Sequence, residues 1–221
     1  EIETIMKYKE ETLDLLEASK CHLLWLGAET GTKEMQERIK KHIGIENIPI
    51  AIGKLAKRNI VPGTFWIIGY PGESRESMLE TLRQASMVKH AYPIAGSEVY
   101  PFRPLPGTED FDAALKLGYV PPKDFYEWGK CFEYKYNAHN TPLPEDVREM
   151  WRRYNNTAAI YDKHVTEGPR WMRDALSRMA GWRLKRGKYT FPIEQKLYDV
   201  YVKATGQIQP GAKDYQPAVD A

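Results

Sequence analysis

The sequence predicts an α/β fold built on a parallel sheet of three strands. Three short runs of apolar, β-branched and aromatic residues, at 22–27, 61–69 and 95–100, have the length of buried strands. The segments between them place apolar residues at helical spacing. Strands that alternate with helices through short connections are expected to be parallel, with right-handed crossovers.

The helices follow from the same spacing, taken in chain order. Apolar residues within 5–16 recur with the helical period, which predicts one helix before the first strand. Met35 and Ile39 indicate a short helix after that strand. The next helix is expected to begin with Asn47 as its N-cap.

The helix between the second and third strands has two candidate caps. Ser74 or Ser77 can accept a hydrogen bond from the first turn, and Ser77-Met78-Leu79-Glu80 has the form of a capping box. The third strand runs into the proline-rich segment 101–107, which is expected to end it.

After residue 120 the alternating pattern stops and helical patterns continue alone. We therefore expect a sheet domain at 1–120, a helical extension at 121–205 and a loose tail at 206–221. Residues 148–188 hold 11 Lys or Arg against 4 Asp or Glu. A solvated helical face is the ordinary interpretation of this charge, and contact with nucleic acid or a membrane surface is the alternative.

The composition excludes several classes of protein. Of the 221 residues, 42% are apolar and 12% aromatic, which is enough for a core and excludes a disordered chain. Lys and Arg number 32 against 30 Asp and Glu, so the global field is weak. Two distant cysteines, Cys21 and Cys131, exclude a disulfide-rich scaffold. With no apolar run long enough to span a bilayer, a cytoplasmic location is expected.

Each predicted strand is followed by a turn that contains glycine. The turns are Gly-Ala-Glu-Thr-Gly-Thr at 27–32, Gly-Tyr-Pro-Gly-Glu-Ser at 69–74 and Pro-Phe-Arg-Pro-Leu-Pro-Gly-Thr at 101–108. Ligands of parallel α/β proteins bind at the carboxyl ends of the strands. Glycine permits close backbone approach, and Glu29 can accept bonds from ribose hydroxyls or an ammonium group. The three turns predict a nucleoside site, with ordinary turn glycines as the alternative for each.

Other kinds of site lack the patterns they need. The five histidines have no metal-ligand spacing, and neither cysteine lies in a Cys-x-x-Cys pattern. Neither a Gly-x-Ser-x-Gly elbow nor a phosphate loop occurs. The sequence therefore predicts no catalytic residue and no metal ligand.

The three turns together resemble characteristic sequence segments of the radical S-adenosylmethionine enzymes. Residues 26–32 are similar to their G-x-E-[ST]-G-[ST] segment, 65–74 to F-I-x-G-x-P-G-E-[ST], and 100–108 to Y-P-x-P-G-T. Order and spacing agree over residues 1–135. Within the superfamily, the chain is most similar to the cobalamin-dependent branch typified by anaerobic magnesium-protoporphyrin IX monomethyl ester cyclase.

This resemblance implies half of a partial (β/α)6 TIM-like barrel, formed by the fourth to sixth strands, with a C-terminal helical extension. S-adenosylmethionine would lie across the carboxyl ends of the strands. The cofactor-binding residues that the resemblance implies are Glu29, Thr30, Gly31, Ile67, Ile68, Gly69, Tyr100, Pro101 and Phe102. Glu73 departs from the family's fifth-strand pattern, because it follows Gly69 by four residues, and a structural role is expected for it.

The family also holds a 4Fe-4S cluster through Cys-x-x-x-Cys-x-x-Cys, and this triplet is missing. We therefore expect the chain to be the C-terminal half of a longer Fe-S oxidoreductase, cut before Glu1 and inactive alone. Its parent would use S-adenosylmethionine, the cluster and, in the cobalamin-dependent branch, cobalamin on a small-molecule substrate. The expected partners are the N-terminal half of the barrel and other copies that pair with exposed strand edges.

Two alternatives remain open at the level of sequence. The parent could instead be a cobalamin-independent relative, such as a methylthiotransferase or a coproporphyrinogen dehydrogenase. From a different class, the chain could be a non-catalytic α/β binding module whose basic tail docks on an acidic partner or RNA.

Overall fold

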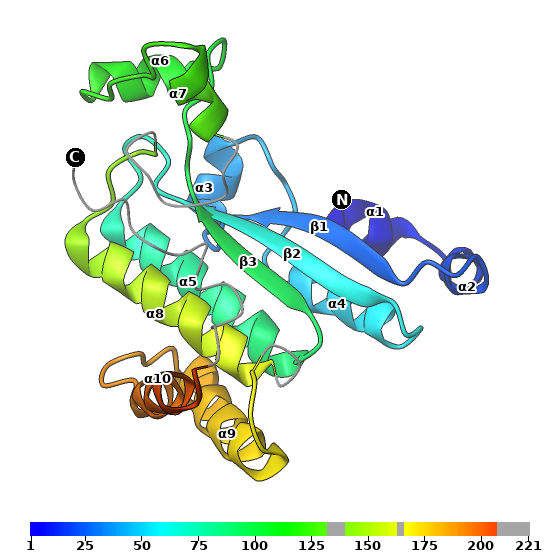
Figure 1. Ribbon diagram of the computed structural model, residues 1–221. Coiled ribbons are helices and arrows are strands. Elements are labelled where there is room, and N and C mark those ends of the chain that lie inside the picture. The colour runs from blue at the N-terminus through cyan, green and yellow to red at the C-terminus, as the bar shows by residue number, and fades with distance from the viewer. Residues whose placement is uncertain (132–139, 163–165, 207–221) are drawn as a thin grey trace.

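A computed structural model describes residues 1–131, 140–162 and 166–206, and all of the predicted tail at 206–221 except its first residue lies outside them. Its three strands are β1 (Leu23–Glu29), β2 (Val61–Ile68) and β3 (Gly96–Pro101). They form one parallel sheet in the order β1-β2-β3 (Figure 1). The prediction of three adjacent parallel strands in this order is confirmed.

Ten helices accompany the sheet in the described residues. They are α1 (Ile2–Lys7), α2 (Glu10–Ala18), α3 (Lys33–Arg38), α4 (Asn47–Ala56), α5 (Arg75–Ala91), α6 (Glu109–Lys116), α7 (Phe125–Lys130), α8 (Glu145–Tyr161), α9 (Arg170–Arg186) and α10 (Ile193–Thr205). The protein is thus an α/β fold with a helical C-terminal part, as the sequence predicts.

The two faces of the sheet differ in what covers them. Leu26, Trp66 and Val99 point to one face and are buried in a core that includes residues of α4 and α5. Trp25 and Phe65 point to the opposite face, because side chains alternate along a strand. No helix in the described part of the chain packs on this second face, which we call the open face (Figure 1).

Helix α8 joins the helical part to the sheet through the same core. Trp151 of α8 donates its indole N–H to the carbonyl of Val99 at 2.7 Å, and the Tyr154 hydroxyl donates to the carbonyl of Ser97 at 2.6 Å. Both aromatic side chains are buried with the sheet residues. The packing therefore continues across residue 120, and α8 covers α5 and the outer strand β3.

Three local predictions are corrected. The single helix expected before the first strand is two helices, because the backbone is extended at Tyr8 and Lys9 and lets each short helix turn its own apolar residues inward. Asn47 is the first residue of α4 rather than its N-cap. Ser74 is the cap of α5 and accepts from the backbone N–H of Ser77 at 3.2 Å, so the capping box assigned to Ser77 is wrong.

None of the helices in the described ranges is long and apolar enough to cross a membrane.

Candidate functional site

Glu29 ends β1 in a conformation that is uncommon for a residue with a side chain. Its φ angle is 65°, and the N–H of Thr30 donates to the carbonyl of Ala28 at 2.8 Å, which closes a three-residue turn around it. The strand register also shifts between Gly27 and Glu29. A left-handed conformation of this kind costs about 1–2 kcal/mol for an L-residue, and such strain is concentrated at functional sites.

The turn directs the Glu29 carboxylate back over Gly27, onto the open face. A Cβ atom at position 27 would meet Glu29 Oε1, so the absence of a side chain at Gly27 leaves room for the carboxylate in this position. The Nζ atom of Lys41 lies 3.7 Å from the same oxygen. Burial raises the pKa of the Glu29 carboxyl, and the charge of Lys41 opposes this rise. Glu29 is therefore a partly buried carboxylate whose ion pair with Lys41 is long, at 3.7 Å.

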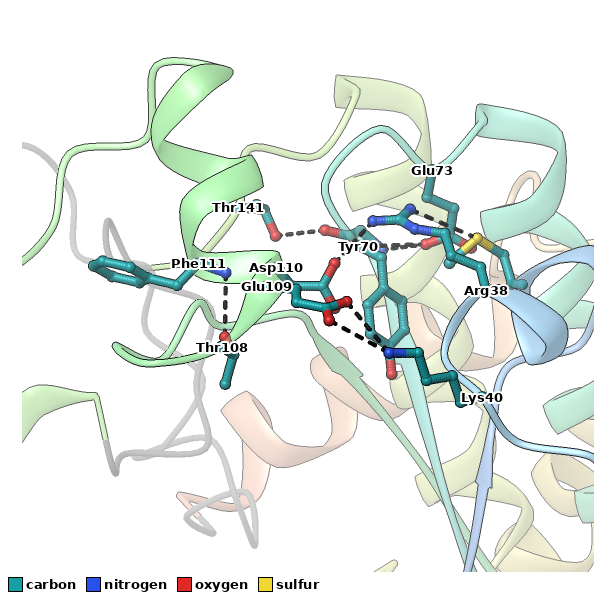
Figure 2. A network of polar contacts seen from close by, with 11 residues as sticks. Arg38, Lys40, Tyr70, Glu73, Thr108, Glu109, Asp110, Phe111 and Thr141 are labelled. Carbon is teal, nitrogen blue, oxygen red and sulfur yellow. Dashed lines mark hydrogen bonds and ion pairs between the residues drawn. The ribbon is translucent and has the colours of Figure 1, made fainter.

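Glu73, after β2, is held by its own loop. One carboxylate oxygen accepts from the N–H groups of Gly69 and Tyr70 at 2.7 and 3.1 Å (Figure 2). The other accepts from the Ser77 hydroxyl at 2.7 Å. Burial still raises the pKa of Glu73, although all three hydrogen bonds favour the charged form. These contacts give Glu73 the structural role that its displaced position in the sequence indicates.

The ends of β2 and β3 are joined by Thr141, which comes from the segment before α8. Its hydroxyl donates to the carbonyl of Gly69 at 2.5 Å (Figure 2). It also lies 3.0 Å from the carbonyl of Phe102. Gly69 has a φ angle of 85°, and a Cβ there would also crowd Leu143. The turn therefore favours glycine at position 69, and the absence of a side chain there leaves room for Leu143.

Tyr70 fills the space between these strand ends. Its ring lies 4.6 Å from the ring of Phe102, measured between centroids. Burial raises the pKa of the Tyr70 hydroxyl well above its usual value, and the nearby carboxylates of Glu29 and Glu73 raise it further. The hydroxyl therefore stays protonated and can act as a hydrogen-bond donor at neutral pH.

Two ion pairs connect the α3 end of the site to α6. Arg38 donates to Asp110 at 2.8 Å, and Lys40 lies 3.4 Å from Glu109 (Figure 2). Because α6 follows β3, these pairs bring the segments after β1 and β3 together across the carboxyl ends of the strands. The Lys40 pair is exposed and adds little stability, whereas the Arg38 pair is half-buried.

The predicted site residues all lie at the carboxyl ends of the three strands, but they face different ways. Glu29, Ile67 and Tyr100 belong to the open face, where Ile67 and Tyr100 are direct neighbours on β2 and β3. Ile68 and Pro101 are buried on the opposite face. Only the first group has side chains that a ligand on the open face could touch.

The remaining predicted residues serve the turns. Thr30 is fully buried with its hydroxyl 3.3 Å from that of Thr81, and the N–H of Gly31 donates to Thr81 at 2.9 Å. Gly69 and Phe102 carry the carbonyls that Thr141 binds. These four residues hold the loops in place through backbone groups and the buried Thr30 hydroxyl.

The open face also has an aromatic floor that the sequence reasoning did not identify. Trp25 and Phe65 stack with ring centroids 4.5 Å apart, and the Tyr100 ring lies 6.0 Å from Phe65. The edge of the Trp25 indole takes the space above Gly63 and Gly96 that side chains would need. Glycines inside two strand patterns were the available signal, since they indicate close approach of another group.

Lys41 and Tyr70 were missed as well. Tyr70 lies within a turn that the motif search covered, so its place beside Gly69 was a usable signal. Lys41 follows α3 in a loop with no motif, and only the folded chain brings it to Glu29.

The site offers a carboxylate, a protonated phenol and an aromatic floor. Among the described residues no group of three His, Cys, Asp or Glu side chains could hold a metal ion. Cys131 is buried, and burial raises the pKa of its thiol, which disfavours the thiolate. The arrangement suits binding of a ligand that has hydrogen-bond donors and a flat apolar part. Compared with known proteins, the chain matches no family model and no curated protein sequence.

Proposed function

We propose that the chain binds the nucleoside part of S-adenosylmethionine at the carboxyl ends of β1, β2 and β3, as the C-terminal half of a radical S-adenosylmethionine barrel. The observation that carries the proposal is Glu29. Its strained backbone and the space over Gly27 place the carboxylate on the open face, and the ion pair with Lys41 at 3.7 Å leaves it with capacity to accept hydrogen bonds there.

The other open-face residues fit the apolar part of such a ligand. Ile67 and Tyr100 are neighbours across β2 and β3, so an adenine could lie against them while Glu29 accepts from ribose hydroxyls or the ligand's ammonium group. Tyr70 and Glu73 keep the β2 turn in shape. S-adenosylmethionine, when bound beside a reduced iron–sulfur cluster, supplies a 5′-deoxyadenosyl radical.

The iron–sulfur cluster itself does not fit the residues of this chain. Its two cysteines cannot supply three clustered thiolates, and the described residues contain no other metal-ligand group. Under the proposal, the cluster, any cobalamin and the redox chemistry belong to the other half of the barrel. This chain contributes binding and orientation of the nucleoside and one wall of the substrate site.

Calorimetric titration of the 221-residue chain with S-adenosylmethionine tests the proposal. Charge-assisted hydrogen bonds contribute about 1.5–3 kcal/mol each, so Glu29→Gln is expected to weaken binding about tenfold or more. Asp112→Asn, on the outer helix α6, is the matched control and should bind like wild type. Equal affinities of wild type and Glu29→Gln, or no binding by either, would contradict the proposal.

A second titration separates the two groups that Glu29 could bind. 5′-Deoxyadenosine keeps the ribose hydroxyls and lacks the ammonium group. If Glu29→Gln weakens binding of both ligands equally, the carboxylate accepts from the ribose. A loss confined to S-adenosylmethionine assigns it to the ammonium group.

A further inference from the structure

Helix α9 carries an unusual combination of exposed tryptophan and positive charge. Trp171 is 73% exposed and Trp182 is 51% exposed, although tryptophan is normally buried in large part. The helix contains six Arg or Lys residues and a single acid, Asp174. Neither the fold nor the nucleoside site uses these exposed groups.

The exposed groups lie on one side of α9. Trp171, Arg178 and Trp182 are separated by seven and four residues, a spacing that places them on the same helical face. Leu176, Ala180 and Leu184 are buried on the other side. We call the solvent side the basic Trp face, and it comprises Trp171, Arg178, Trp182, Lys185 and Arg186.

The positive charges of this face are not neutralised by carboxylates of the described residues. Arg178 and Lys185 form no ion pair within the described part of the chain, and Arg186 lies 4.5 Å from the centre of the Trp182 ring. The cation–π contact leaves the charge of Arg186 in place. The other basic residues of α9 differ, since Arg183 is buried against Glu194 and Arg170 lies 3.9 Å from Asp174.

The neighbouring helix α10 adds exposed aliphatic surface. It packs beside α9 through Tyr198 and Val202. Its residues Ile193, Leu197 and Val200 recur at the i, i+4, i+7 spacing of one helical face and are exposed. Because Tyr198 and Val202 lie on the opposite side of α10, this aliphatic row points away from α9 and is not part of the basic Trp face.

We propose that the basic Trp face is a docking surface for an anionic lipid bilayer. Trp side chains favour the membrane–water interface, and Lys and Arg on the same helix are attracted to anionic headgroups. The Arg186 guanidinium lies over the Trp182 ring and occupies one face on which a base would stack, which favours a bilayer over a nucleic acid. The chain would lie on the surface, with α9 in the plane of the headgroups.

Flotation with lipid vesicles tests the proposal on the full 221-residue chain. Wild type is expected to float with vesicles of phosphatidylcholine and phosphatidylglycerol, and not with phosphatidylcholine alone. The variant Arg178→Gln/Lys185→Gln/Arg186→Gln should bind the anionic vesicles on the order of 100-fold more weakly, since each cation contributes about 1 kcal/mol near such a surface. Trp171→Ala/Trp182→Ala should also lose binding.

The matched control removes three exposed lysines elsewhere. Lys9→Gln/Lys57→Gln/Lys116→Gln lowers the net charge equally and is expected to float like wild type. Circular dichroism of each variant checks the fold. Equal losses in both triple variants, or no preference for anionic vesicles, would overturn the proposal.

A nucleic acid would be revealed by a parallel measurement. Tighter binding to single-stranded RNA than to anionic vesicles, abolished by Trp171→Ala/Trp182→Ala, would assign the face to RNA and overturn the bilayer proposal. These binding tests are independent of the nucleoside site, because the α9 variants should keep the S-adenosylmethionine affinity of wild type.

Discussion

The carboxylates of Glu29 and Glu73 lie at the ends of neighbouring strands, Glu73 buried and Glu29 partly exposed, and the protein holds them differently. Glu73 accepts three hydrogen bonds from its own loop at 2.7–3.1 Å. Glu29 has one cation at 3.7 Å and a left-handed backbone. Burial raises the pKa of both. The comparison teaches that a raised pKa alone does not identify a binding residue. The number of hydrogen bonds that the carboxylate already accepts from the protein decides whether it can accept more from a ligand.

The largest expected difference lies in stability. Glu73→Ala leaves the N–H groups of Gly69 and Tyr70 without an acceptor, and each buried unsatisfied group costs about 1–3 kcal/mol. We expect the free energy of unfolding to fall by about 3 kcal/mol or more, measured by urea denaturation. Glu29→Ala should change it by less than about 1 kcal/mol. Similar losses in both variants would remove the distinction between the two residues.

A smaller and opposite effect is expected when the strain at Glu29 is released. Glu29→Gly suits a φ angle of 65° and removes a buried charge, so the free energy of unfolding should rise by about 1 kcal/mol. Lys20→Gly is the matched control, because Lys20 has a φ of 63° at an exposed helix end. A stabilised Glu29→Gly that also loses S-adenosylmethionine binding would show that the protein gives up stability to keep a carboxylate at this position. A Glu29→Gly variant that is less stable than wild type, while Lys20→Gly is not, would contradict this expectation.

The smallest effect is a dependence on pH. Because the folded-state pKa of Glu29 lies above its ordinary value of 4.5, the native state binds the proton more tightly than the unfolded chain does. This contribution to stability is present below pH 4.5 and is lost as the pH rises through the folded-state pKa. Glu29→Gln cannot ionise, so its stability relative to wild type should increase between pH 4.5 and 7. Urea midpoints at the two pH values measure the change, and a constant difference would contradict it.

Residue spacing alone was sufficient for the sheet. Each strand is a short apolar run that ends near a turn glycine. These features are local in the sequence, so they predict the strands without knowledge of the rest of the fold. The parallel order followed from connections long enough to hold a helix. The split of α1 from α2 was missed, because the same apolar spacing is compatible with one helix or two, and only packing against the core selects between them.

The sequence by itself determined which segments form strands and helices, and that three loops meet at one edge of a parallel sheet. It could not say which side chains at that edge face a ligand. The tertiary structure decided that Thr30 and Ile68 point into the core while Glu29 turns back over Gly27. It also brought Lys41 and Thr141 to the site. The physical reason is that strand identity depends on local periodicity, whereas the direction and charge of a side chain depend on contacts between residues far apart in the chain.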